Sequence, residues 1–129
     1  MALDQAFAKK IQDHLHGGAE LTQPSGHKVL LMTADGNAID NGTELASGGD
    51  YVAGTGQSVS FSAATLDTPS ASNNSAAVAF TGMPAAAITG IEIWAGSDRL
   101  EYGSLASPKT TSAGDTLSFA IGAISSTLK

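Results

Sequence analysis

AITGIEIWAGSDRLEYGSL, residues 87–105, is the stretch of sequence that decides the fold. Its first half, about residues 87–95, is the most hydrophobic segment of the chain and contains three isoleucines and Trp94. Gly96-Ser97-Asp98 then marks a turn, because glycine beside small polar residues favours a reversal of the chain. Two strand-like runs joined by such a turn predict a β-hairpin, with residues 99–105 as its second strand.

Shorter strands are expected on both sides of this hairpin. HKVLLMT, residues 27–33, is a short apolar run typical of a buried strand. QSVSFSA, residues 57–63, alternates polar and apolar residues with the period of a half-buried strand. The turn signals in residues 34–50 predict a loop or a loose hairpin, and residues 65–75 are expected to form a second polar loop. The remaining predicted strands are residues 76–81, 116–120 and 123–128, the last two separated at Gly122.

The N-terminal segment has a different period. Four apolar residues recur at every fourth position, which predicts an amphipathic helix over residues 3–16. Asp4 would lie in its first turn, where the helix dipole favours an anion. Gly17-Gly18 would end it, since glycine tolerates the left-handed conformation of a helix cap. The apolar stripe consists of Leu3, Phe7, Ile11 and Leu15.

These elements predict a mainly β fold behind one helix. The 129 residues fit a single domain, with the N-terminal amphipathic helix in residues 1–18 and an antiparallel β-sandwich or barrel in residues 19–129. Several short strands at this spacing are typical of the jelly-roll or immunoglobulin-like class. No repeating βα unit follows the helix, and no heptad pattern predicts a coiled-coil shaft.

Composition and charge exclude some classes of binding partner. Only 14% of the residues are charged, against about 25% in an average protein, which suits a surface partly covered by neighbours. The net charge is −6 and basic residues do not cluster, so a nucleic-acid partner is not expected. No apolar run approaches the roughly 20 residues that span a bilayer, so no membrane partner is expected either. The absence of cysteine excludes disulfides and thiolate metal sites.

No metal, cofactor or catalytic site is predicted. His14 and His16 lie two residues apart on the expected helix and would point away from each other. Residues 35–40 (DGNAID) faintly resemble a calcium loop, but Ile39 and Ala46 occupy positions that need oxygen ligands. A turn rich in Asp and Asn fits these residues better.

The predicted hairpin also carries side chains that could serve chemistry or sugar binding. Glu92 and Glu101 would lie near each other if the hairpin forms, but both are interpreted as solvated strand residues with Arg99 as a counter-charge. Trp94 and Tyr102 could form a sugar-stacking platform on neighbouring strands. Because aromatic residues make up only 5% of the chain, Trp94 is expected instead to be a core residue or an interface anchor.

The helix leaves two alternatives open. Its stripe either packs on its own sandwich, as amphipathic helices normally do, or docks on a neighbouring subunit or on the surface of a larger assembly. The candidate assembly contacts are therefore Leu3, Phe7, Ile11, Leu15 and Trp94.

Four blocks of sequence carry a resemblance to known proteins: ALDQAFAKKIQDHLHGG (2–18), GTELASGGDYVAGTGQSVSF (42–61), SNNSAAVAF (72–80) and GSLASPKTTSAGDTLSFAIGAISSTL (103–128). Together, and in this order, they resemble one family of small phage virion proteins, commonly labelled tail fibre proteins and found mostly in siphophages. The chain departs from the family pattern at residues 27–39, which are more polar, and at Trp94-Ala95, where the family commonly has Phe-Asp.

This resemblance implies a non-enzymatic structural protein of a phage virion, made in the bacterial cytoplasm. Capsid decoration, in which the protein cements the assembled head, is the first expectation because the chain is compact and lacks a shaft. The alternatives are a tail fibre or tail-tip protein and a carbohydrate-binding module that recognises the host. The expected partners are other copies of the chain, as a trimer, and the major capsid or tail proteins of the phage.

Overall fold

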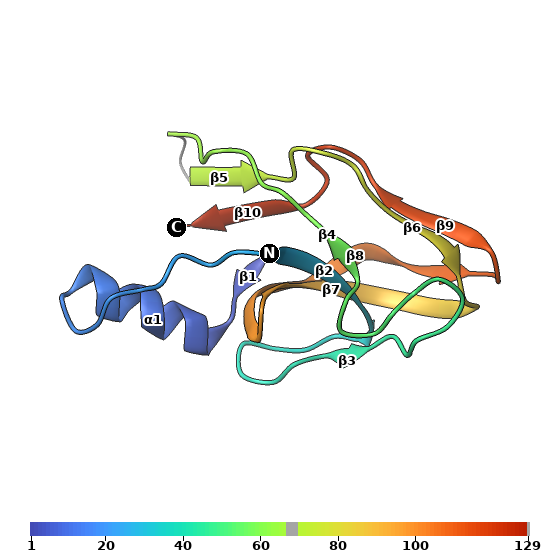
Figure 1. Ribbon diagram of the computed structural model, residues 1–129, viewed down its shortest axis with the longest axis horizontal. Coiled ribbons are helices and arrows are strands. Elements are labelled where there is room, and N and C mark those ends of the chain that lie inside the picture. Colours follow the sequence, from blue (N-terminus) through green and yellow to red (C-terminus); the bar gives the residue numbers. More distant parts are fainter. Residues whose placement is uncertain (67–69, 129) are drawn as a thin grey trace.

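The computed structural model of the protein describes residues 1–66 and 70–128. Strands make up 48% of the chain and helix 9%, so the predicted mainly β fold with one N-terminal helix is confirmed. The strands form antiparallel sheets in a sandwich-like arrangement (Figure 1).

The first layer is a six-stranded sheet built around the predicted hairpin. Its strands follow the order β1-β8-β7-β2-β3, and β4 also pairs with β2. The central hairpin has the largest interface, because β7 pairs with β8 along nearly its whole length. The bounds of these strands are β1 Ala2–Leu3, β2 His27–Ala34, β3 Thr43–Glu44, β4 Gln57–Ser58, β7 Ala86–Ala95 and β8 Asp98–Thr111.

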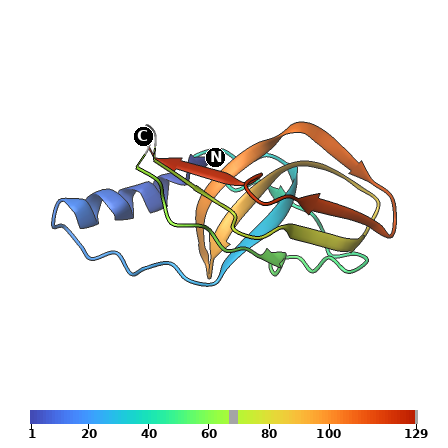
Figure 2. The same cartoon turned by 90° about the horizontal axis from the view of Figure 1, so that it is seen from above.

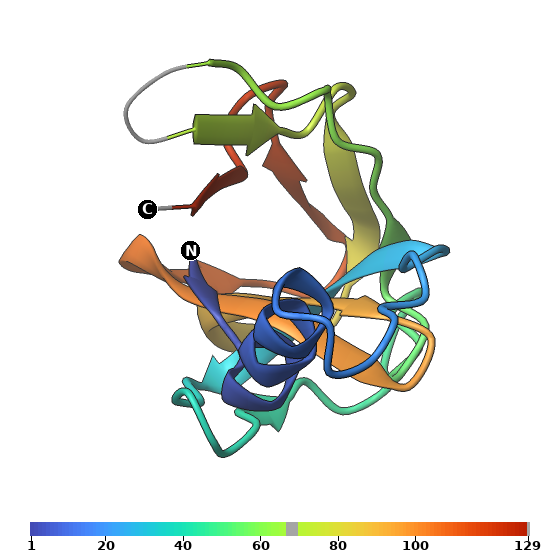
Figure 3. The same cartoon turned by 90° about the vertical axis from the view of Figure 1, so that its left-hand side faces the viewer.

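The second layer consists of two short ribbons, β5 (Ser70–Asn73) with β10 (Ser125–Leu128), and β6 (Val78–Met83) with β9 (Asp115–Phe119). Figure 3 shows both ribbons on the same side of the six-stranded sheet. The chain passes from β5 to β6 and, after β7 and β8, from β9 to β10, so the two ribbons lie end to end with a break between them.

Asn74 fills that break. Its side chain is 1% exposed and accepts a hydrogen bond from the backbone nitrogen of Ile124 (2.9 Å). The same amide donates to the carbonyl oxygens of Ala76 (2.9 Å) and Ala120 (3.0 Å). The backbone of Asn74 also pairs here, donating to the carbonyl oxygen of Ile124 (3.0 Å) and accepting from the backbone nitrogen of Gly122 (3.1 Å). Its buried side chain therefore adds three hydrogen bonds to the backbone pairing at the junction of the two ribbons.

The structure corrects two loop and strand predictions. The strand predicted over residues 57–63 pairs with β2 only at Gln57–Ser58 and then crosses to the second layer, where Phe61 bridges Asn74. The loop predicted over residues 65–75 contains strand β5, whose polar residues are held by pairing with β10. Part of that loop, residues 67–69, lies outside the described residues.

The apolar run in β2 is continuous because both faces of the strand are buried there. Val29 and Leu31 are fully buried in the main cluster between the layers, together with Ile93, Phe80 and other residues. Leu30 and Met32 point to the opposite face and are also buried, at 4% and 2% exposed. The six-stranded sheet is therefore covered on both faces, which an uninterrupted apolar run indicates.

The helix is shorter than predicted. α1 spans Gln5–Leu15, and Asp4 is its N-cap, accepting a hydrogen bond from the backbone nitrogen of Phe7 (3.1 Å). Leu3 belongs to β1 and pairs with Glu101, so the expectation that it lies in the helix is wrong. α1 lies to one side of the layered strands (Figures 1 and 2). Within the described residues, no helix has the length and apolar character needed to cross a bilayer.

Candidate functional site

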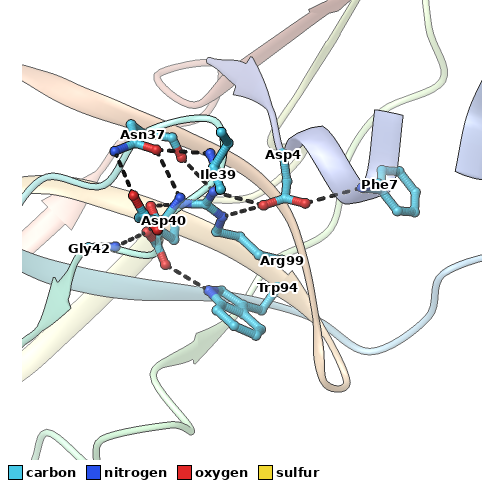
Figure 4. A network of polar contacts seen from close by, with 9 residues as sticks. Asp4, Phe7, Asn37, Ile39, Asp40, Gly42, Trp94 and Arg99 are labelled. Carbon is cyan, nitrogen blue, oxygen red and sulfur yellow. Dashed lines mark hydrogen bonds and ion pairs between the residues drawn. The ribbon is translucent and has the colours of Figure 1, made fainter. Parts of the chain in front are cut away.

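A buried network of polar groups connects the N-terminal segment to the central hairpin (Figure 4). Arg99, the only arginine of the chain, lies at its centre and is 4% exposed. Its guanidinium pairs with Asp4 (Nη2–Oδ1 2.7 Å) and with Glu92 (Nη1–Oε2 3.1 Å). Burial alone would lower the pKa of Arg99, but its hydrogen bonds to these two carboxylates raise it.

The loop between β2 and β3 completes this network. Arg99 donates to the carbonyl oxygens of Asn37 and Asp40, and the backbone nitrogen of Gly42 donates to Glu92 Oε2 (2.7 Å). Gly42 fits because an added Cβ would lie 2.6 Å from the carbonyl oxygen of Ala34. The network thus holds together three segments that are far apart in the sequence.

The predicted Asx-rich turn in this loop is confirmed. Asn37 Oδ1 accepts hydrogen bonds from the backbone nitrogens of Ile39 (2.9 Å) and Asp40 (2.8 Å), as an Asx turn requires. Within residues 1–66 and 70–128, no group of three or more His, Cys, Asp or Glu side chains is placed to hold a metal ion.

Glu92 and Glu101 are buried, at 1% and 7% exposed, so the expectation that they are solvated is wrong. They also lie on opposite faces of the sheet, since Ile93 pairs with Glu101 and adjacent residues of a strand alternate between faces. Glu92 pairs with Arg99, as the sequence predicted for one of these carboxylates. Glu101 accepts from Ser126 Oγ (2.8 Å), and burial raises the pKa of its carboxyl group.

The histidines have separate surroundings. His14 Nδ1 accepts from the backbone nitrogen of Leu21 (3.1 Å), which ties the returning chain to α1. His27 lies in β2 with its ring 6.2 Å from that of Phe61, while His16 is the C-cap of α1. The three histidines therefore lie in separate places, and His16 acts through its backbone nitrogen, which donates to Gln12 and His14.

The apolar stripe of α1 becomes more exposed from its N-terminal end to its C-terminal end. Phe7 packs against the core, Ile11 is half-buried, and Leu15 is 69% exposed. None of the residues of α1 is buried. The inner end of the stripe therefore packs on its own sandwich, whereas the outer end does not.

Trp94 is half-buried on the face of the sheet that carries Glu92. Its Nε1 donates to Glu92 Oε1 (3.0 Å), so the indole is fixed to the buried network. Tyr102 contacts Arg99, whose guanidinium carbon lies 4.9 Å from the centre of the Tyr102 ring. Trp94 lines two of the hollows described below and Tyr102 lines a different one, so these hollows do not bring the two aromatic residues together.

The sequence did not predict the network. Its members come from residues 4, 37–42, 92 and 99, and no local pattern relates them. A lone arginine directly after the turn of an apolar hairpin is the one available signal, because buried arginine requires carboxylate partners.

The fold and these contacts define a class, a small β-sandwich-like protein with a buried ion-pair network. Every buried side-chain nitrogen and oxygen of the described residues has a hydrogen-bond partner, so the polar interior is used for holding segments in place.

The sequence model of one protein family, described as Podophage GP4 fiber I protein gp80, matches residues 2–127. The chain belongs to this family of phage fibre proteins, which are structural components of the virion. The resemblance to phage virion proteins is therefore confirmed, but the family is a podophage family and the expected siphophage origin is corrected. No curated protein sequence matches the chain.

Proposed function

We propose that the chain is a subunit of a phage fibre and acts by occupying a fixed place in the particle, without turning over a substrate. The family supports a fibre component. The main support for a role in assembly comes from the outer end of α1. There the apolar stripe no longer packs on its own sandwich, and Leu15 is exposed.

The occupant of this stripe would be a second copy of the chain. A fibre repeats one subunit, and the low content of charged residues suits contacts between copies. Burying a leucine completely contributes about 1.5–3 kcal/mol, and several copies in a closed ring, such as a trimer, would add their contacts. Ile11 and Leu15 would make the contact, with Phe7 anchoring the helix.

The other two contact candidates have partners inside the chain. Leu3 pairs with Glu101 through β1, and Trp94 is bound to Glu92. We therefore place the assembly contact on the helix. The family description supports a fibre and does not mention capsid decoration, the first expectation from the sequence. Capsid decoration therefore stays an untested prediction.

The experiment compares Leu15→Asp with Gln12→Asp by analytical ultracentrifugation over a range of concentrations. Gln12 is exposed on the same helix but off the stripe, so the two variants add the same charge. We expect the native chain and the control to associate alike. Leu15→Asp should need at least about tenfold higher concentration, since tenfold corresponds to about 1.4 kcal/mol.

Circular dichroism would verify that each variant is folded. A native chain that sediments as a monomer at every concentration would contradict the proposed contact. An unchanged association of folded Leu15→Asp would also contradict it.

A further inference from the structure

A shallow groove beside Trp94 is not used by the assembly contact. It has a volume of about 290 Å³ and lies over β2, β3 and β7, and its wall includes Lys28, Asn41, Glu44 and Trp94. Asn41 and Trp94 also line a neighbouring hollow of about 250 Å³, so the two hollows share one rim. An elongated ligand could therefore extend across the indole from one hollow to the other.

The indole of Trp94 is held in position before any ligand arrives. Its Nε1 donates to Glu92, which is 1% exposed and also accepts from Arg99 and from the backbone of Gly42 (Figure 4). Binding would therefore cost little side-chain ordering at this residue. The negative face of an aromatic ring attracts C–H groups that carry partial positive charge.

Glu44 is also oriented in advance. Its Oε1 accepts from Tyr51 Oη (2.8 Å) and from the backbone nitrogen of Gly54 (2.7 Å). Burial raises the pKa of Tyr51, which keeps its hydroxyl protonated as a donor. Within the described residues nothing donates to Glu44 Oε2, so this oxygen is available to accept hydrogen bonds from a ligand.

Asn41 and Lys28 supply hydrogen-bond donors to the groove. The side-chain amide of Asn41 makes no hydrogen bond to the described residues, and amides both donate and accept. Lys28 Nζ donates to the carbonyl oxygen of Gly54 (2.6 Å) and retains further hydrogens. The groove thus combines an aromatic face with an acceptor, a donor and an amide.

We propose that this groove binds a neutral saccharide, with a sugar ring stacked on Trp94 and its hydroxyls bound by Glu44 and Asn41. A sugar ring offers C–H groups on its faces and hydroxyls at its edges, which matches this arrangement. The carboxylates of Glu44 and Glu92 in the wall disfavour anionic ligands such as nucleic acid. The site goes beyond the assembly role, and no residue that lines the groove itself belongs to α1.

The chain contains a single tryptophan, so fluorescence excited at a wavelength that tyrosine does not absorb reports on Trp94 in this groove. The test applies the full chain to an array of bacterial surface glycans and then titrates the strongest neutral glycan while recording Trp94 fluorescence. We expect saturable binding with a change in the emission.

Matched variants assign the binding to the groove. Glu44→Gln keeps the acceptor for Tyr51 and Gly54 but replaces the free carboxylate oxygen, and Asn41→Ala removes the amide. Each should weaken binding about tenfold, as loss of a hydrogen bond to a charged or polar group predicts. Lys109→Ala, on exposed β8 outside the groove, should bind like the native chain.

Two results would overturn the proposal. One is an array on which no neutral glycan binds the native chain. The other is saturable binding that neither Glu44→Gln nor Asn41→Ala weakens. Because the assay uses the chain without the particle, either failure leaves the fibre role to be judged by its own experiment.

Discussion

At the scale of single residues, charge is used inside this protein to fix segments to one another. Arg99 reaches two carboxylates and two backbone carbonyls, and its partners are up to 95 positions away in the sequence. A buried ion pair adds little compared with an apolar replacement of all its members, but removal of one member leaves an uncompensated charge. Arg99 is therefore the residue whose loss should cost most.

Replacing Arg99 by Met should lower the free energy of unfolding by about 3–5 kcal/mol, because Asp4 and Glu92 would remain buried without a cation. The measurement is urea unfolding followed by circular dichroism. Lys10→Met is the matched control, since the Lys10–Asp98 pair (3.0 Å) has both side chains about half exposed, at 49% and 52%. That control should change stability by less than about 1 kcal/mol. Equal effects of the two substitutions would contradict a structural role for the network.

Glu101 gives a prediction about pH. Burial raises the pKa of its carboxyl group, although Ser126 and the amino group of Met1 lower it. The folded chain then keeps this proton to higher pH than the unfolded chain, so the contribution of Glu101 to stability falls as pH rises through that window. Glu101→Gln removes this titration. Its unfolding free energy should increase relative to that of the native chain as the pH rises above about 4, the ordinary range of a glutamate carboxyl group. A difference that stays constant with pH, or changes in the opposite direction, would show that the carboxyl is not perturbed in this way.

At the scale of elements, the sequence predicted those whose pattern is local. A pattern of apolar residues within the segment itself marks the hairpin of β7 and β8, the apolar strand β2 and the helix α1. Strands β1, β3 and β4 have two residues each, too few to show a period, and they exist because β2 or β8 offers them an edge. Leu3 shows the limit: its spacing fits the helical stripe, but pairing with β8 places it in β1. The Arg99 network was unpredictable for the same reason, since only the fold brings its members together.

Asn74 should be essential to the junction between the two ribbons of the second layer. Asn74→Ala removes three side-chain hydrogen bonds and leaves buried backbone groups unpaired, so the free energy of unfolding should fall by about 3 kcal/mol. Asn73→Ala is the matched control, because Asn73 takes part mainly through its backbone pairing with Ser125. It should change stability by less than about 0.5 kcal/mol. The measurement is thermal or urea unfolding of both variants, and an Asn74→Ala chain as stable as the control would refute this role.

At the scale of the whole molecule, the sandwich separates two surfaces with different proposed uses. The outer end of α1 offers exposed apolar residues to a neighbouring copy, and the groove at Trp94 offers polar groups around an aromatic face. The resemblance of four sequence blocks was sufficient to predict a phage virion protein, because it covers most of the chain. It did not distinguish a fibre from a head decoration, since both roles depend on contacts with molecules outside this chain.

The most direct test of the fibre role is an electron cryo-microscopy map of the intact virion in which this chain is traced. We expect repeated copies in the fibres, each with the outer end of α1 seated against a neighbouring copy. Copies arranged over the capsid lattice, or virions that lack this polypeptide, would contradict the account.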